Sequence, residues 1–391
     1  MRTGTLTDLD SRGSGVMPFG RPKAAFDPIL NSSSRRILHQ HARQEDAGRV
    51  GICATVDLLR QWGWLEAVLP AKAGGSDLGS GGAGAERSVR ALIELARTNL
   101  SAARLFEGHV NAVHLLDLYA GEDLRARAFD VVRQGGLLGV WGADATPPVS
   151  LDPASGVLRG QKRYASGLGT VAEAVISVST DDGVRLCLAN VSDPVRQDGS
   201  TWTMNGMRAS ASGSYDFDGL DSGGFTMFGA PGAYHREPYF VGGVWRIAAI
   251  QLGGTLGLLE AARDRLAELD RLDAPPQIGR LAGILQECLG AIGLVERAGK
   301  IAGGIEGMSD PDRAVALSIF ARLHTEEVGQ RALSAIERSI GLEHFDDSSE
   351  TGRKARDLAV YMRQVARDAL QARAGATGLD VDRDILGLWH G

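Results

Sequence analysis

Cysteine is scarce in this sequence, and its three copies lie far apart. Cys53, Cys187 and Cys288 are an odd number of thiols among 391 residues. This pattern favours free thiols in a reducing compartment over a disulfide framework or a zinc site. The first residues also lack the charged-then-apolar layout of a secretory signal. We therefore expect a cytoplasmic protein without a metal centre.

The chain also has no excess of basic residues and no long apolar run. Its net charge is -6 at pH 7, whereas a nucleic-acid-binding surface needs a basic footprint. No stretch holds the roughly 18 unbroken apolar residues that indicate a membrane-spanning helix. We expect neither nucleic acid nor a membrane as a partner.

The composition that is present suits a large globular protein. Hydrophobic residues make up 43% of the chain and charged residues 23%, which is enough for a buried core and a solvated surface. A chain of 391 residues is long enough for two or three domains. The spacing of its apolar residues changes near residue 137 and again near residue 239, so we expect three structural parts.

The first part precedes the change near residue 137. Residues 1–30 are rich in Gly, Ser, Pro and charge, so we expect an arm that is mobile or pinned on a partner subunit. Helical spacing over residues 31–136 predicts an N-terminal α-helical domain. Within it, Leu69-Pro70 and Gly74-Gly75 indicate a loop. The Gly/Ser/Ala-rich stretch that follows, up to Ala85, is expected to be flexible.

The middle part, residues 137–238, reads as short strands. Apolar or β-branched runs bounded by Gly, Asp and Ser occupy residues 137–141, 171–178 and 184–191. Apolar and polar residues alternate in Trp202-Thr203-Met204 and in Tyr215-Asp216-Phe217, which is the period of a strand with one solvent-exposed face. Short strands with closely spaced turns predict a small antiparallel β-barrel.

The last part, residues 239–391, returns to helical spacing. Pro275-Pro276 breaks its first helix, and apolar stripes follow in residues 278–295, 315–340 and 353–366. Long helices joined by short links predict a four-helix bundle. The predicted fold class is therefore α+β, with an N-terminal helical domain, a central antiparallel β-barrel and a C-terminal four-helix bundle.

Four short motifs occur in order along these parts. They are Leu69-Pro70 with Gly74-Gly75, the Gly-Gln-Lys-Arg-Tyr-Ala-Ser-Gly run at 160–167, Gly206-Met207-Arg208 and Arg356-Asp357. With this order of helices and strands, the chain after about residue 30 resembles the acyl-CoA dehydrogenase family of flavoproteins. The resemblance implies FAD between barrel and bundle, an acyl-CoA or similar small-molecule substrate, and an electron acceptor or flavin reductase. It also implies assembly as a homodimer or homotetramer.

The resemblance assigns a flavin-contacting role to two strand ends. A flavin ring needs an aromatic or apolar wall and hydrogen-bond donors, which strand ends supply without added charge. Tyr164 would be the wall, and Ser166 with the amide of Ala165 would address the N5/O4 edge. From residue type alone, without the resemblance, Tyr164 and Trp141 are better explained as buried barrel residues.

Three further features of the family's cofactor-binding pattern are incomplete or missing here: its first flavin-contacting strand, its late Gly-Gly motif and its phosphate-binding arginine. Trp141, Gly142 and Ala143 fall on its first flavin-contacting strand, but Ala143-Asp144-Ala145 replaces the usual Thr-Glu-Pro. Gly341 is what remains of a Gly-Gly motif late in the bundle. The family's phosphate-binding arginine has no clear counterpart, because the nearby Arg263 and Arg265 lack the accompanying Phe-Gly.

The catalytic base of the family is missing at both of its usual positions. The classical enzymes remove the substrate's α-proton with a glutamate held near the flavin. Aligning Arg356-Asp357 places Val365 at its commonest position, and the alternative position falls on Trp245. Neither side chain accepts a proton. The acidic residues that remain as substitutes are Glu343, Glu337, Asp144 and Glu107.

A related branch of the family uses reduced flavin and oxygen, often with histidines near the flavin. His109 is the candidate here, and a structural histidine is its alternative; His344 lies near the expected flavin edge but in a loop. Three functions stay open. They are FAD-dependent α,β-dehydrogenation of an acyl thioester, a flavin-dependent monooxygenase or oxidase reaction, and a catalytically degenerate paralogue with a binding or assembly role.

Overall fold

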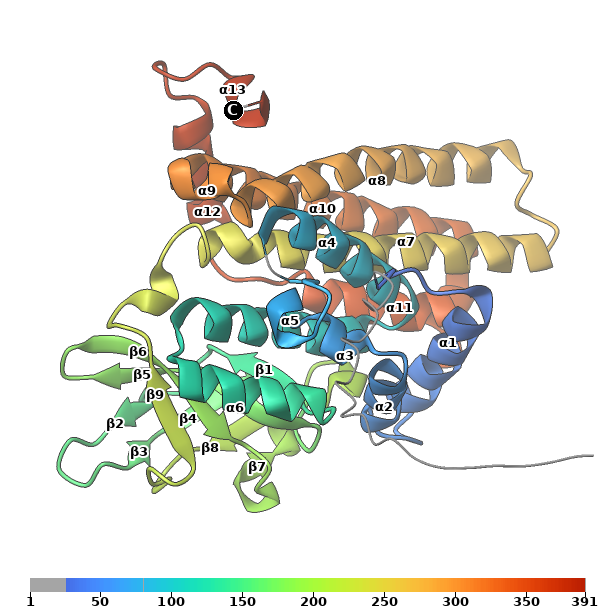
Figure 1. The fold of residues 1–391 in the computed structure, drawn as a ribbon. Helices are drawn as coiled ribbons and strands as arrows, with labels where there is room; N and C mark the ends of the chain where they lie inside the picture. Colours follow the sequence, from blue (N-terminus) through green and yellow to red (C-terminus); the bar gives the residue numbers. More distant parts are fainter. Residues whose placement is uncertain (1–25, 80, 391) are drawn as a thin grey trace, which may run out of the picture.

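A computed structural model describes residues 26–79 and 81–390 of the protein. The predicted N-terminal arm, residues 1–30, therefore falls mostly outside the described residues. Figure 1 shows long C-terminal helices along one side of the molecule and the strands on the opposite side, with α5 between them. The described C-terminal residues lie at the end of the helical layer, away from the strands.

In the described part of the chain, seven short or medium helices precede the strands. Two of them begin at an asparagine that caps the helix. The side chain of Asn31 accepts a hydrogen bond from the main-chain N–H of Ser34, and that of Asn99 accepts one from Ala102. Their bounds are α1 Ser32–Asp46, α2 Cys53–Gln61, α3 Trp64–Ala67, η1 Ala71–Ala73, α4 Gly81–Thr98, α5 Leu100–Tyr119 and α6 Glu122–Arg133.

The end of the Gly/Ser/Ala-rich stretch, from Gly81 to Ala85, forms the start of α4. Close packing explains its glycines: a Cβ on Gly84 would overlap the carbonyl oxygen of Asp77, and one on Gly82 would lie 3.3 Å from the carbonyl oxygen of Lys300. Gly82 and Gly84 therefore allow a close approach of neighbouring backbone.

The strands form two sheets. The larger has the order β3-β2-β5-β6-β9, with β1 also paired to β5, and the smaller has the order β4-β8-β7. The bounds are β1 Leu137–Trp141, β2 Ser150–Leu151, β3 Leu158–Arg159, β4 Gln161–Ala165, β5 Val171–Thr180, β6 Gly183–Asn190, β7 Gln197–Asp198, β8 Gly213–Asp216 and β9 Phe225–Phe228.

The predicted closed antiparallel barrel is wrong in two respects. The described strands make two separate sheets, and β5 pairs in parallel with both β1 and β2. The central position of β5 explains this, because most of its residues from Val171 to Val178 are buried and it has neighbours on both edges. The expected strand around Trp202 is also absent; its indole nitrogen donates instead to the carbonyl oxygen of Gly206 at 3.3 Å.

Helices follow the strands to the end of the described chain. The longest three, α7, α8 and α10, pack against one another, and α11 packs on α7 (Figure 1). The bounds are η5 Ala233–His235, η6 Val241–Val244, α7 Trp245–Glu268, α8 Pro275–Ala302, α9 Ile305–Ser309, α10 Pro311–Ile340, η7 Gly341–Phe345, α11 Glu350–Tyr361, α12 Arg367–Gly378 and α13 Gly387–His390.

The N-terminal helix α4 joins this helical layer by packing on α7 and α8. Two glycines in α7 make the contact close: a Cβ on Gly253 would lie 2.6 Å from the carbonyl oxygen of Ile93, and one on Gly257 would overlap that of Arg97. Among the described residues, α8 is the one helix long and apolar enough to cross a membrane by length and composition. Its contacts with α4, α7 and α10 account for its inward apolar face.

Helix α5 is the element that places the functional region. It contacts β1 on one side and α4, α7 and α11 on the other. The apolar core runs continuously from the N-terminal helices through the larger sheet to the helical layer. Polar residues on α5 are therefore held where sheet and helices meet.

Candidate functional site

The two strand ends singled out by sequence lie side by side. The main-chain N–H of Arg163 donates to the carbonyl of Ala143 at 2.9 Å, and that of Ala145 donates to Gln161 at 2.9 Å. The indole N–H of Trp141 donates to the carbonyl oxygen of Ser166 at 3.1 Å. Residues just after β1 and the end of β4 thus form one continuous edge.

Tyr164 stands out from this edge because the ladder is interrupted there. Its φ of 57° is in the left-handed region, and the pairing of β4 with β8 shifts register between Arg163 and Ala165. The Tyr164 ring is 45% exposed and meets Trp202 edge-to-face at 6.1 Å. Tyr164 is therefore a partly open aromatic wall, with the guanidinium of Arg163 over its ring at 4.9 Å from the centroid. Trp141, 2% exposed, is a core residue.

A chain of hydroxyls continues from the aromatic wall. Ser212 donates to Ser166 at 3.0 Å, Ser210 and Ser212 are 2.7 Å apart, and Ser210 also donates to the carbonyl oxygen of Met207 at 2.6 Å. A groove of about 610 Å³ begins at Ser212 and Trp202. Aromatic surface, uncharged hydroxyls and space occur together, so these residues fit the chemical needs of a flavin ring.

A second cavity, of about 200 Å³, lies between α5, the end of β1 and the helical layer. Its charged residues are Arg104 and Glu107, which form an ion pair at 2.5 Å on α5. The full lining is Arg104, Glu107, Asn111, Val140, Gly142, Tyr234, Ile247, Tyr361 and Gln364. Gly142 belongs to the strand end described above, so the cavity adjoins that edge.

Two tyrosines give this cavity neutral hydrogen-bonding groups. Burial raises the pKa of Tyr234 to about 12 and also raises that of Tyr361, with the nearby Glu107 adding to both shifts. Both hydroxyls therefore stay protonated at neutral pH and can donate. A Cβ on Gly142 would lie 2.7 Å from the Tyr234 hydroxyl, so only glycine allows this close approach.

Tyr234 also separates the cavity from a neighbouring one of about 250 Å³. This third cavity shares Gly142 and Tyr234 with the second and is further lined by Asp144, Ser177, Ser179, Val184, His235 and Phe240.

Arg246 is a buried cation that directly precedes Ile247, a lining residue of the second cavity, on α7. It is 5% exposed, its guanidinium lies 4.6 Å from the centroid of the Trp245 ring, and its Nη1 donates to Gly243 at 3.3 Å. Its Nε has no hydrogen-bond partner among the described residues. Burial lowers the pKa of Arg246 to about 10, and Glu107 opposes that shift.

Known proteins were compared with the whole chain. No family model matches it, and no curated protein matches it significantly. Among solved structures, the FMN-bound dibenzothiophene monooxygenase TdsC from Paenibacillus sp. A11-2 matches with a TM-score of 0.73 and 17% identity, over 88% of this chain and 95% of that one.

Two further matches differ in reaction. A nitrososynthase from Micromonospora carbonacea var. africana has a TM-score of 0.70 and 18% identity, covering 89% of this chain and 94% of its own. Butyryl-CoA dehydrogenase from Megasphaera elsdenii has a TM-score of 0.70 and 16% identity, covering 90% and 99%. The chain has the acyl-CoA dehydrogenase fold. The resemblance seen in the four motifs is confirmed as a likeness of fold, and the reaction has to be argued from the site.

Within this acyl-CoA dehydrogenase fold, His109 lies in the core and lines neither cavity. It is fully buried; Nε2 lies 3.1 Å from the carbonyl oxygen of Leu65, and Nδ1 accepts from the main-chain N–H of Leu138 at 3.1 Å. Burial lowers its pKa to about 4. These contacts join α5 to α3 and β1, which is a structural role.

The two family positions for the base carry no acid near the cavity. Val365 is 85% exposed and Trp245 is 2% exposed. Of the four acidic substitutes, Glu107 alone lines the second cavity. Asp144 lines the third and is neutralised by the buried Lys162 at 2.5 Å.

Glu343 and Gly341 lie in a different region, beyond the C-terminal end of α10. Gly341 follows α10 with a φ of 77°, which explains the glycine. Glu343 pairs with Arg265 at 2.5 Å. Because Arg265 and Ile247 are 18 residues apart on α7, roughly 27 Å of helix separates the Glu343–Arg265 pair from the second cavity.

The two remaining candidates also lie outside the second cavity. Glu337 is exposed, and the buried His344 contacts the hydroxyl of Thr351 at 3.1 Å.

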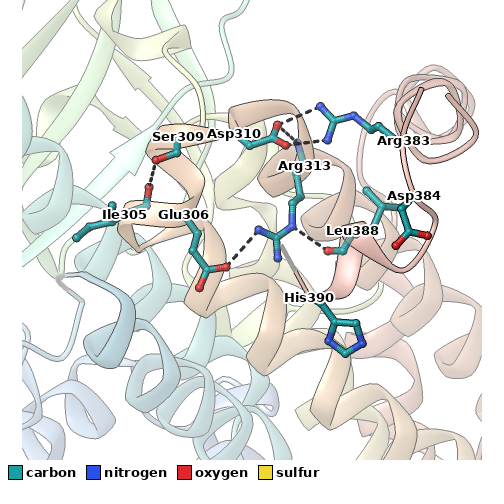
Figure 2. A pocket seen from close by; sticks show the side chains of 10 residues that line it. Ile305, Glu306, Ser309, Asp310, Arg313, Arg383, Asp384, Leu388 and His390 are labelled. Carbon is teal, nitrogen blue, oxygen red and sulfur yellow. Dashed lines mark hydrogen bonds and ion pairs between the residues drawn. The ribbon is translucent and has the colours of Figure 1, made fainter. Parts of the chain in front are cut away.

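A further pocket of about 460 Å³ lies at the C-terminal corner (Figure 2). Its charged groups pair with one another: Arg383 with Asp310 at 2.7 Å, and Arg313 with Glu306 at 3.2 Å. Arg313 also donates to the carbonyl oxygen of Leu388 at 3.0 Å. None of the residues predicted from sequence lines this pocket, and its arginines hold the C-terminal segment on α10.

Sequence reasoning gave no role to most of the residues around the second cavity. These are the lining residues Arg104, Asn111, Tyr234, Tyr361 and Gln364, and Arg246, which precedes the lining residue Ile247 on α7. One signal was present: α5 is apolar almost throughout, yet positions 104, 107, 111 and 114 are polar at helical spacing. A polar stripe on a buried helix indicates a cavity or a buried network.

Proposed function

We propose that the protein is a flavin-dependent enzyme. Tyr164, Ala165 and Ser166, with the main chain of Gly142 and Ala143, would hold the ring. A bound flavin would supply two-electron redox chemistry, either by accepting a hydride or, when reduced, by activating oxygen. The observation that supports this proposal is the exposed Tyr164 ring beside the Ser166–Ser212 hydroxyls.

We propose FMN over FAD as the flavin, although the motifs alone pointed to FAD. The arginines nearest to the family's phosphate-binding position are already neutralised: Arg263 pairs with Asp264 at 2.6 Å, and Arg265 with Glu268 at 2.9 Å as well as with Glu343. This leaves little free positive charge for a diphosphate. The TdsC structure is also described as FMN-bound.

For the reaction, we propose oxygenation of a small substrate by a flavin that a separate reductase delivers in reduced form. The supporting observation is the missing base, since Val365 is exposed and Trp245 is apolar. In this proposal Arg104 and Glu107 orient the substrate, and the protonated Tyr234 and Tyr361 donate hydrogen bonds to it.

The test uses the purified full-length protein with FMN or FAD and a generic flavin reductase with NADH. We expect bound flavin and oxygen-dependent conversion of a member of an indole, thioether and amine panel. Heat-inactivated protein and free reduced flavin are the controls. Flavin uptake without any oxygen-dependent product across the panel would count against oxygenation.

Dehydrogenation of an acyl thioester is the second candidate, because Glu107 is a carboxylate inside the cavity. Its ion pair with Arg104 reduces its availability for proton removal. Anaerobic mixing of the flavin-loaded protein with acyl-CoAs of several chain lengths separates the candidates. If the wild type bleaches its flavin and Glu107→Gln does not, the result supports dehydrogenation. If the wild type does not bleach its flavin, the result favours oxygenation.

A further inference from the structure

Arg246 does not line the second cavity, but it precedes the lining residue Ile247 on α7 and interacts electrostatically with Glu107. The charges in and beside this cavity are unbalanced. Its neighbourhood contains the cations of Arg104 and Arg246 and the single carboxylate of Glu107. Glu107 forms its ion pair with Arg104 at 2.5 Å. Among the described residues, Arg246 has no carboxylate within ion-pair distance. One positive charge is therefore left over in a largely buried region.

The environment of Arg246 is unusual for a buried arginine. A guanidinium has five N–H donors, and here Nη1 donates at 3.3 Å to Gly243 while Nε has no partner among the described residues. The Trp245 ring at 4.6 Å gives partial compensation through its π face. The cation persists at neutral pH even though burial lowers its pKa. A buried cation with spare donors is costly unless an anion accompanies it.

The neighbouring groups cannot supply that anion. His114 has a pKa well below its usual range because of burial and the charge of Arg246, and it packs edge-to-face on Tyr239. Tyr234 and Tyr361 stay protonated. These groups are neutral, and the tyrosine hydroxyls can donate to an oxygen atom.

We propose that the substrate presents a small oxyanion, of carboxylate type, to this cavity, with Arg104 and Arg246 as its cationic partners. The cavity of about 200 Å³ is smaller than the roughly 300–1,000 Å³ usual for drug-sized ligands, so it takes a small acid or the acidic end of a longer molecule. The identification of this ligand as the substrate rests on the proposed flavin-dependent function. The binding of the ligand to the cavity does not depend on that function.

The test measures binding to the full-length protein without added flavin. Acetate, butyrate and benzoate are each compared with the corresponding amide by calorimetry, at fixed ionic strength. We expect at least one acid to bind tenfold or more tightly than its amide. That preference should disappear in Arg246→Met and weaken in Arg104→Met, and it should persist in Arg271→Met, which changes an exposed arginine outside the cavity.

Thermal unfolding of the same variants guards against a folding defect. Because Arg246 is a buried cation without a carboxylate partner, Arg246→Met should unfold no earlier than the wild type. The preferred acid should stabilise the wild type and Arg271→Met but not Arg246→Met. Equal binding of every acid and amide, or an acid preference unchanged in both cavity variants, would overturn the proposal. Acid preference in a protein that takes up no flavin would refute the proposed function and leave this inference standing.

Discussion

The main-chain N–H of Met207 donates a 2.6 Å hydrogen bond to the carboxylate of Asp357. This bond joins two of the four sequence motifs, Gly206-Met207-Arg208 after the strands and Arg356-Asp357 on α11. The approach is close, because a Cβ on Gly206 would overlap the carbonyl oxygen of Arg356. The two motifs therefore fix the strand region against the helical layer.

Loss of the Asp357 carboxylate should destabilise the protein. Asp357→Ala leaves the Met207 N–H unpaired and removes a partner of the buried Arg353, which lies 3.4 Å from Asp357. Removing one member of a buried pair costs about 3 kcal/mol or more. Denaturant unfolding checks this, with Asp264→Ala as control because Asp264 and Arg263 form an exposed pair. Equal stability of Asp357→Ala and wild type would contradict the predicted role.

Tyr164 should contribute to flavin affinity and little to stability. Its ring is 45% exposed, and an aromatic contact is worth about 0.5–1.5 kcal/mol beyond area burial. Tyr164→Ala should therefore weaken flavin binding up to about tenfold while the unfolding temperature stays close to that of the wild type. Flavin fluorescence titration measures the affinity. Trp389→Ala, an aromatic of similar exposure at the C-terminal corner, should bind flavin normally.

His109 should make the protein sensitive to mild acid. Its pKa falls from 6.5 to about 4 on burial, so between these values the unfolded chain binds a proton that the folded chain does not. Stability from this group is present above pH 6.5 and is lost as the pH falls towards 4. A shift of this size corresponds to at most about 3 kcal/mol.

The variant His109→Gln isolates this contribution. It should be less stable at neutral pH but should lose less stability than the wild type between pH 6.5 and pH 4. His390→Gln, which changes an exposed histidine, is the control. Parallel stability curves for His109→Gln and the wild type would show that His109 is not the titrating group.

The outward face of α8 predicts self-association. Ile278, Leu285 and Leu289 are 52%, 43% and 60% exposed and follow one stripe, with Gly293 open to solvent further along. We expect a homodimer or homotetramer that buries this stripe, as the sequence resemblance implied. Light scattering should show a smaller species for the double variant Leu285→Lys/Leu289→Lys than for the wild type. The control Val195→Lys, which changes an exposed residue outside α8, should leave the size of the species unchanged. A monomeric wild type would contradict the prediction.

Local patterns in the sequence predicted many of the elements and few of the long-range contacts. The apolar, β-branched runs at 137–141, 171–178 and 184–191 are strands because local preference and burial agree there. The parallel pairing of β1 with β5 was not predictable, since a strand's composition does not identify its neighbour. Trp202 has strand spacing but contacts Tyr164 instead of entering a ladder.

The candidate site shows the same limit. The motif at 160–167 marked Tyr164 and Ser166, and the structure brings them beside Gly142 and Ala143. The second cavity combines residues from 104 to 364, so only the fold assembles it. Polar residues on α5 hinted at it, but Arg246 and Tyr234 had no local signal.

The most direct test of the central proposal is titration of the purified protein with FMN and FAD, followed by flavin fluorescence and the visible spectrum. The account predicts saturable binding of a flavin, tighter for FMN, and weaker binding by Tyr164→Ala. A colourless protein that alters the fluorescence of neither flavin would contradict it.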